Sequence, residues 1–199
     1  MPRISIITST YNRPAYLRRA VDSIARQTFR DFEHIIVEDY ESSPPVDPTV
    51  YPDSIVRRVP IFMGSYGIFA RNMGAEIASG ELLAWLDDDN WWEPDHLELL
   101  VGLLDEKSVD FVWGSTRLWR DNKEVEVRNC SQPRRGGIDT SEIVVKRELF
   151  MRHGGWHRAD GHGVDGLAAQ RWVEGGARYA HLPIVTHNQW LGERFDPRD

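Results

Sequence analysis

The sequence predicts an α/β fold in which a mostly parallel central sheet carries helices on both faces, formed by one domain over residues 1–199. Two observations support this prediction. Short apolar runs at 4–7, 34–37 and 82–86 have the length and composition of strands buried on both faces. Segments between them repeat apolar residues at helical spacing. An alternation of strands and helices is typical of a layered α/β domain with right-handed crossovers.

Three helices are predicted beside these strands. The first begins at Pro14, because proline suits the first turn of a helix. The second follows the spacing of Ala70, Met73 and Ile77, and the third begins at Pro94. The apolar faces of these helices are expected to pack on the two sides of the sheet.

The rest of the chain continues the alternation. The predicted elements are strands at 111–113, 142–145 and 184–186, a helix at 167–173, and loops at 42–53 and 129–140. We find no linker that divides the chain.

Composition narrows the classes of function. The net charge of −7 argues against a duplex nucleic-acid binder, which needs clustered lysine and arginine. No apolar stretch approaches the roughly 18 residues of a membrane span. Cys130 is the single cysteine and no signal-peptide pattern opens the chain, so a cytoplasmic location is expected.

Polar residues follow each of the first three predicted strands. They are Thr8-Ser9-Thr10, Glu38-Asp39 and Asp87-Asp88-Asp89-Asn90. If the strands are parallel, these clusters meet at one carboxyl edge of the sheet, where open α/β sheets bind ligands.

The acidic cluster has two interpretations. Three consecutive carboxylates repel one another, and Mn²⁺ or Mg²⁺ bound together with phosphate oxygens would relieve that repulsion. In an extended segment Asp87 and Asp89 would point to one side and Asp88 to the other. The alternative is a solvated acidic turn that caps the helix beginning at Pro94.

Other motifs are excluded. No G-x-x-x-x-G-K-[ST] segment is present, which excludes a P-loop. The segment 161–166 matches G-x-G-x-x-G, but it follows no apolar strand and has no acidic residue about 20 positions later. We therefore reject a dinucleotide site.

Several segments resemble family 2 glycosyltransferases in the expected order. They are 4–14, 23–29, 32–39, 70–81 and 86–90, with a weaker match at 143–150 and 154–156. The resemblance implies a GT-A fold, with a nucleotide-sugar-binding half at 1–105 and an acceptor-binding, catalytic half at 106–199.

The resemblance also implies roles for individual residues. Donor-binding positions are Thr8, Thr10, Tyr11, Asp39, Arg71, Asp87 and Asp88, and metal-binding positions are Asp87, Asp89 and His187. Asp165 corresponds to the family's general base, although Val164 stands where the family has glutamate. For His187 the alternative is a strand-end histidine bonded to the backbone.

These residue types fit transfer of a sugar from a nucleoside diphosphate. The departing diphosphate needs charge neutralisation, and a carboxylate removes the proton from the acceptor hydroxyl. One base opposite the leaving group predicts inversion at the anomeric carbon. A UDP-sugar is the donor that the resemblance favours. The acceptor is expected to be compact or a saccharide, and a homo-oligomer that completes its site is left open.

Two further features have paired interpretations. Trp91 and Trp92 follow the acidic cluster, so one of them is a candidate for lining the donor or acceptor site, and core packing is the alternative. The segment 134–137 reads Arg-Arg-Gly-Gly and is either a lid over the diphosphate or a solvated loop.

Functions of other classes remain open. Residues 170–172 lack the spacer of the Gln-x-x-Arg-Trp motif of processive synthases, so that class is disfavoured. A nucleotidyltransferase-like or diphosphate-cleaving enzyme would use the same metal chemistry. A non-catalytic sugar-nucleotide-binding module is allowed by Val164.

Overall fold

One mixed sheet forms the centre of the molecule. The computed structural model describes residues 1–40, 42–60, 67–157 and 163–192. Within these ranges the sheet has nine strands in the order β3-β2-β1-β4-β8-β6-β9-β5, and β7 pairs with β6 beside this path. The strands are β1 (Ile4–Thr10), β2 (Phe32–Glu38), β3 (Ser54–Arg58), β4 (Leu82–Trp85), β5 (Trp91–Trp92), β6 (Phe111–Arg120), β7 (Lys123–Arg128), β8 (Ile143–Lys146) and β9 (Tyr179–Trp190).

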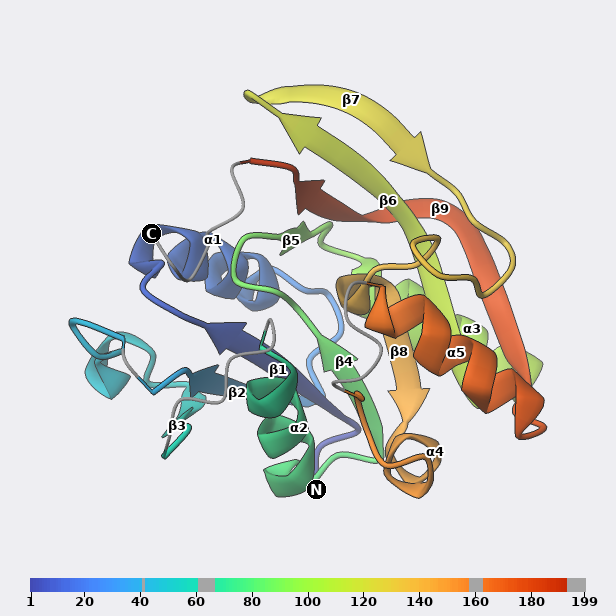
Figure 1. Cartoon of the computed structure of the whole chain (residues 1–199), viewed down its shortest axis with the longest axis horizontal. Helices are drawn as coiled ribbons and strands as arrows, with labels where there is room; N and C mark the ends of the chain where they lie inside the picture. The colour runs from blue at the N-terminus through green and yellow to red at the C-terminus, as the bar shows by residue number, and fades with distance from the viewer. Residues whose placement is uncertain (41, 61–66, 158–162, 193–199) are drawn as a thin grey trace.

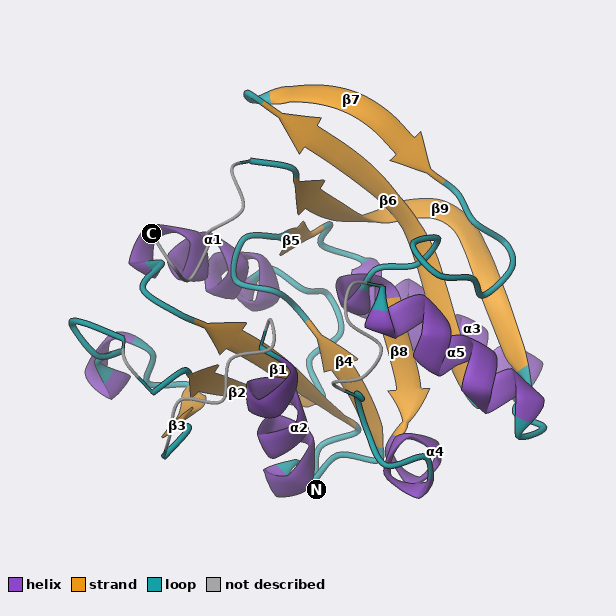
Figure 2. Ribbon diagram, in the orientation of Figure 1, coloured by secondary structure: helices purple, strands orange, loops and turns teal. Residues whose placement is uncertain are grey.

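Helices cover both faces of the sheet (Figures 1 and 2). They are α1 (Pro14–Ala25), α2 (Ile68–Ile77), α3 (His96–Lys107), α4 (Arg147–Arg152) and α5 (Val164–Glu174), with short 3-10 helices η1 (Pro48–Val50) and η2 (Thr140–Glu142). The predicted α/β architecture with helices on both faces is confirmed. No helix among these residues is long and apolar enough to cross a membrane.

Strand direction differs between the two ends of the sheet. β1 is parallel to β2 and β4, and β2 is parallel to β3, as the continuous apolar runs predict. Beyond β4 the strand β8 runs antiparallel to both β4 and β6, whereas β6 and β9 are parallel. Sequence patterns carry no signal for this change because strand direction depends on the path of the connections.

Alternating side chains on the central strands supply two apolar cores. Ile7 and Trp85 point toward the face covered by α2, α4 and α5, where Trp85 contacts Phe150 and Trp156. Ile6 on the neighbouring position points to the opposite face, which α1 and α3 cover. The two cores sandwich the strands, so the loops at their carboxyl ends have a rigid base.

Two predicted helices differ in detail from the structure. The third begins at His96 rather than Pro94, with Asp95 at the N-cap position. In α2 the predicted apolar stripe is displaced, because Ile77 is exposed while Arg71 and Gly74 are buried against the sheet. A sequence pattern predicts that an arginine in a helix faces solvent. Arg71 is buried instead because it pairs with Asp87 at the candidate site.

Candidate active site

The polar ends of β1, β2 and β4 meet at one edge of the sheet, as predicted. The Thr10 hydroxyl at the end of β1 donates to the Asp88 carboxylate beyond β4 at 2.8 Å. The backbone N–H of Asp39 beyond β2 donates to the Thr10 carbonyl at 2.9 Å. Parallel pairing therefore brings together residues that lie almost 80 positions apart in the chain.

The acidic segment is a turn and not an extended strand. The Asn90 N–H donates to the Asp87 carbonyl at 3.0 Å. The predicted alternation of side chains is therefore wrong, because Asp88 and Asp89 both reach the same guanidinium. Arg13 Nη1 donates to Asp88 at 3.2 Å and to Asp89 at 2.9 Å. Arg13 thus offsets part of the repulsion that the sequence implied.

Asp87 is held separately by Arg71. Arg71 Nε and Nη2 donate to Asp87 Oδ1 at 3.1 and 2.6 Å. This pairing explains the burial of Arg71 on the inner side of α2, where its side chain is shielded and its charge is compensated. Arg71 therefore lies beside the acidic segment, as expected for a donor-binding residue.

Negative charge remains in excess around Asp89. Burial raises the pKa of Asp89 to about 7, and the neighbouring carboxylates of Asp87 and Asp88 raise it further than Arg13 lowers it. Burial also raises the pKa of Asp88. Asp89 retains 31% exposure of its side chain, so its carboxylate is accessible to a cation from solvent.

Asp165 lies in the first turn of α5 with 8% of its surface exposed. It accepts hydrogen bonds from the Gly166 N–H at 3.0 Å and the Thr140 hydroxyl at 3.3 Å. Burial and the negative charge of Asp139 raise the pKa of Asp165 to about 6. The adjacent residue of η2, Ser141, accepts from the Asp87 N–H at 3.1 Å, so η2 connects Asp165 with the acidic turn.

His187 on β9 is fully buried in the same region. Its Nδ1 lies 3.0 Å from the Thr116 hydroxyl, and its Nε2 has no hydrogen-bond partner among the residues that the structure describes. Asp139 Oδ1 is 3.9 Å from that Nε2. Burial lowers the pKa of His187 to about 3, so the ring is neutral at ordinary pH. The alternative prediction, that His187 is hydrogen-bonded to the backbone, is wrong, because Nδ1 contacts a side-chain hydroxyl and Nε2 contacts no backbone group of the described residues.

Sequence reasoning missed four polar residues of this region, namely Thr116, Arg128, Asp139 and Glu142. Asp139 accepts from the Ser141 N–H at 3.0 Å and from Gln189 at 2.8 Å. Its only sequence signal is the pattern Asp139-Thr140-Ser141-Glu142, which resembles a helix cap. Burial raises the pKa of Glu142 to about 8.

Other predicted donor-site residues are placed differently. Thr8 is fully buried and its hydroxyl lies 3.0 Å from His34 Nε2, so its side chain cannot line an open base pocket. The resemblance implied a donor-binding role for Thr8, and no sequence pattern indicates that His34 encloses its hydroxyl. Tyr11 and Asp39 are half-buried beyond the ends of β1 and β2.

The two tryptophans separate into different roles. Trp92 is 2% exposed, stacks on His96 and donates to the Ser141 carbonyl at 2.7 Å, so it belongs to the core. Trp91 is half-buried, with Arg19 4.3 Å above its ring and Trp119 beside it. Trp91 is therefore the member of the pair that lies near the surface.

The loop at 129–140 packs against the start of α5. A Cβ on Gly166 would lie 2.0 Å from the Arg134 carbonyl oxygen, so only glycine fits there. Arg134 Nε donates to Cys130 Sγ at 3.3 Å. The loop thus adjoins the helical turn of Asp165, and its function as a lid stays a prediction.

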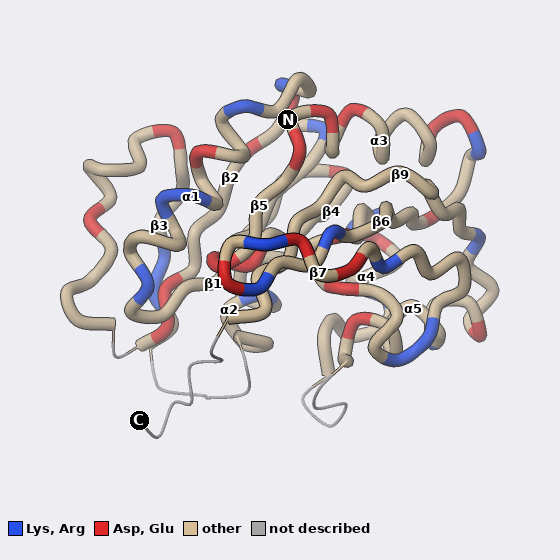
Figure 3. Tube along the Cα trace, turned by 90° about the horizontal axis from the view of Figure 1, so that it is seen from above, with Lys and Arg blue, Asp and Glu red and all other residues tan. Residues whose placement is uncertain are grey.

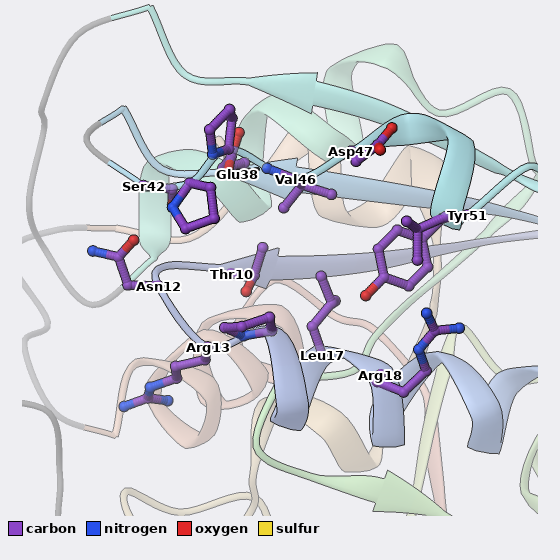
Figure 4. A pocket seen from close by; sticks show the side chains of 14 residues that line it. Thr10, Asn12, Arg13, Leu17, Arg18, Glu38, Ser42, Val46, Asp47 and Tyr51 are labelled. Atoms are coloured by element: carbon purple, nitrogen blue, oxygen red, sulfur yellow. Dashed lines mark hydrogen bonds between the residues drawn. The ribbon is translucent and has the colours of Figure 1, made fainter.

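A cavity of about 250 Å³ lies beside this edge, between the start of α1 and the loop after β2 (Figure 4). Leu17, Val46 and Tyr51 form much of its wall, and Thr10 and Arg13 separate it from the acidic turn. Asp87, Asp89 and Asp165 do not line it. The cavity is therefore a neighbour of the candidate site and not the site itself.

Within the part of the chain that the structure describes, no three His, Cys, Asp or Glu side chains are arranged to hold a metal ion by themselves. A cation bound among these side chains would therefore need phosphate oxygens and water to complete its shell. The unpartnered Nε2 of His187 and the accessible carboxylate of Asp89 are ligand types that suit Mn²⁺ or Mg²⁺.

Known proteins match the chain over most of its length. The chain is 34% identical over 110 residues to the uncharacterised glycosyltransferase YwdF of Bacillus subtilis, a match that covers 55% of this chain and 40% of that protein. The matched part of the chain therefore spans less than half the length of this relative. Among solved structures, S. aureus TarS 1-349 aligns with a TM-score of 0.75 at 18% identity, covering 94% of this chain and 60% of TarS. A TarS structure in complex with UDP-GlcNAc aligns with a TM-score of 0.72.

A second solved neighbour was determined with a metal. The mannosyltransferase PcManGT of Pyrobaculum calidifontis, in complex with GDP-Man and Mn²⁺, aligns with a TM-score of 0.71 at 21% identity, covering 97% of this chain and 58% of that one. These likenesses show a shared GT-A fold. The sequence profile described as Glycosyl transferase family 2 matches residues 5–162. The chain belongs to glycosyl transferase family 2.

Proposed function

We propose that this chain transfers a sugar from a nucleoside diphosphate sugar to an acceptor hydroxyl, with inversion at the anomeric carbon. The observation that carries the proposal is that η2 joins the acidic turn to Asp165 and His187. The Asp87 N–H donates to the Ser141 hydroxyl at 3.1 Å, and the Thr140 hydroxyl donates to Asp165 at 3.3 Å. Asp139, just before η2, lies 3.9 Å from His187 Nε2. Membership of the family supports the class of reaction.

The residues present fit a divalent cation. Asp89 and Asp87 would hold it from the acidic turn, and His187 would approach from β9. When bound, Mn²⁺ or Mg²⁺ would neutralise charge on the departing diphosphate. Arg13 and Arg71 already orient the carboxylates of the acidic turn, which reduces the rearrangement needed on binding.

Asp165 is the proposed general base. In its carboxylate form it would accept the proton of the acceptor hydroxyl as that oxygen bonds to the anomeric carbon and the bond to the diphosphate breaks. The Gly166 N–H and the Thr140 hydroxyl hold the side chain in position. Val164 occupies the place of the family's glutamate and is itself buried, so it contributes packing and not charge.

A uridine nucleotide is the proposed donor, supported by the likeness to TarS with UDP-GlcNAc. The likeness to PcManGT with GDP-Man makes a guanosine donor the competing choice and supports use of Mn²⁺. Trp91 is the proposed contact for a compact or saccharide acceptor. A cytoplasmic location, a homo-oligomer and the functional division at residues 105 and 106 stay predictions.

Calorimetric titration of UDP with and without Mn²⁺ tests the donor site. We expect binding that depends on Mn²⁺ in the wild type and that Asp89→Ala abolishes. The matched control is Asp53→Ala, because Asp53 is an exposed aspartate in the turn before β3. GDP is titrated in parallel to identify the base. Absence of diphosphate binding in every condition would reject the proposal and favour a non-catalytic module.

The variant Asp165→Asn tests the base. The amide cannot accept the proton, so we expect transfer to fall by about 10²–10⁴-fold while UDP binding is retained. Product analysis of the wild type distinguishes the reaction class. Free nucleoside diphosphate with a new glycoside supports transfer, whereas release of a nucleoside monophosphate would indicate a diphosphate-cleaving enzyme.

A further inference from the structure

One row of polar side chains crosses three strands behind the site. Thr116 on β6 is paired in register with Arg128 on β7 and with His187 on β9. Directly paired residues project to the same face of a sheet, so these three side chains line up across it. Glu142 from η2 packs onto this row and is 1% exposed.

The hydrogen bonds of the row converge on Glu142. Arg128 Nη2 donates to Glu142 Oε1 at 2.7 Å, and the Thr116 hydroxyl donates to the same oxygen. Because the Thr116 proton is directed at Glu142, its oxygen is left to accept from His187 Nδ1 at 3.0 Å. Oε1 accepts both bonds whether or not Glu142 carries a proton on its other oxygen.

The bond to Thr116 determines which nitrogen of His187 carries the proton. A neutral imidazole has one N–H, and when Nδ1 is the donor, Nε2 carries a lone pair. Among the described residues that lone pair has no hydrogen-bond partner, and Asp139 Oδ1, which accepts from the Ser141 N–H, lies 3.9 Å away. The nitrogen and the carboxylate oxygen therefore offer two neighbouring ligand atoms to a cation.

We infer that Thr116 and Glu142 are positioning residues that hold His187 in its Nδ1–H tautomer, so that Nε2 and Asp139 present ligand atoms to the divalent cation. The inference rests on the proposed function. It adds Asp139 to the candidate metal ligands. It also gives Thr116 and Glu142, which do not contact the acidic turn, the role of positioning His187. Partners that fix the tautomer of a metal-binding histidine typically contribute 10–100-fold to metal affinity.

The variant Thr116→Val tests this inference, because valine has nearly the same shape and lacks the hydroxyl. The first readout needs no metal: long-range ¹H–¹⁵N spectra, with His187 assigned by comparison with His187→Gln. We expect Nδ1–H in the wild type and a shift toward Nε2–H in Thr116→Val. The second readout is Mn²⁺ affinity in the presence of UDP, expected to fall 10–100-fold and to recover in Thr116→Ser.

The outcomes separate this inference from the proposed function. An Nε2–H tautomer in the wild type, or an unchanged Mn²⁺ affinity in Thr116→Val, would overturn the inference while Mn²⁺-dependent UDP binding still supports the donor site. A wild type that binds no Mn²⁺ with UDP would overturn both.

Discussion

Individual carboxylates in this protein differ because of their immediate surroundings. Asp87 is paired by two nitrogens of Arg71, whereas Asp89 shares Arg13 with Asp88. Burial and the neighbouring carboxylates raise the pKa of Asp89 to about 7, and burial beside Asp139 raises that of Asp165 to about 6. We therefore expect the carboxylates to have different tasks, with Asp89 binding a cation and Asp165 accepting a proton near neutral pH.

The raised pKa of Asp165 predicts the acid limb of the pH profile of transfer. The base must be ionised, so kcat/KM should rise with pH and level off above the pKa of about 6. The measurement is the pH dependence of kcat/KM at saturating Mn²⁺ between pH 5 and 8. A profile that stays flat across this interval would reject Asp165 as the base. Asp165→Glu, which retains a carboxylate, should keep a rising limb at lower activity.

Among the elements, α2 packs closely against the sheet at one glycine. A Cβ on Gly74 would lie 2.4 Å from Ile7 Cγ2 on β1, so glycine permits the helix backbone to approach the strand. This approach brings Arg71, one turn earlier, within reach of Asp87. Helix packing and the electrostatics of the site therefore depend on the same glycine.

A pair of glycine substitutions tests this packing. Gly74→Ala should destabilise the fold by about 1–3 kcal/mol, because the new methyl group overlaps Ile7. The matched control is Gly102→Ala in α3, where a Cβ meets no atom within 4 Å and alanine should stabilise the helix by up to about 1 kcal/mol. Urea denaturation measures both. Equal effects of the two variants would contradict the close approach of α2.

In the whole molecule, charge of both signs is interspersed along the trace (Figure 3). A concentration of acidic groups lies instead at the candidate site, where η2 and the residue before it join the acidic turn to α5 and β9. Burial raises the pKa of Asp89, Asp165 and Glu142, so folding favours their protonated forms. Ionisation of these carboxylates therefore lowers the free energy of unfolding.

This arrangement predicts how stability depends on pH. Above about pH 6.5 the folded state binds more protons than the unfolded state, because the raised pKa values of Asp89 and Glu142 lie at about 7 and 8, so stability falls as pH rises through them. Below that pH the buried neutral rings of His34, His96 and His187, whose pKa values burial lowers, act in the opposite sense. We expect a net loss of roughly 1–2 kcal/mol from pH 6.5 to 8 without metal. Urea denaturation across this range measures it, and Asp89→Asn should flatten the curve. Stability that increases with pH would contradict the raised pKa values.

The sequence by itself determined the family, the central strands, the helices beside them and the meeting of Thr10, Asp39 and the acidic segment at one edge. These features depend on local periodicity and on parallel strands, which neighbouring residues specify. Only the tertiary structure decided that Arg13 and Arg71 hold the aspartates, that Thr8 is enclosed, and that Thr116, Asp139 and Glu142 surround His187. Those contacts join segments that lie far apart in the chain. They depend on the register of the strands and on the path of the loops, and neither can be predicted from the local sequence.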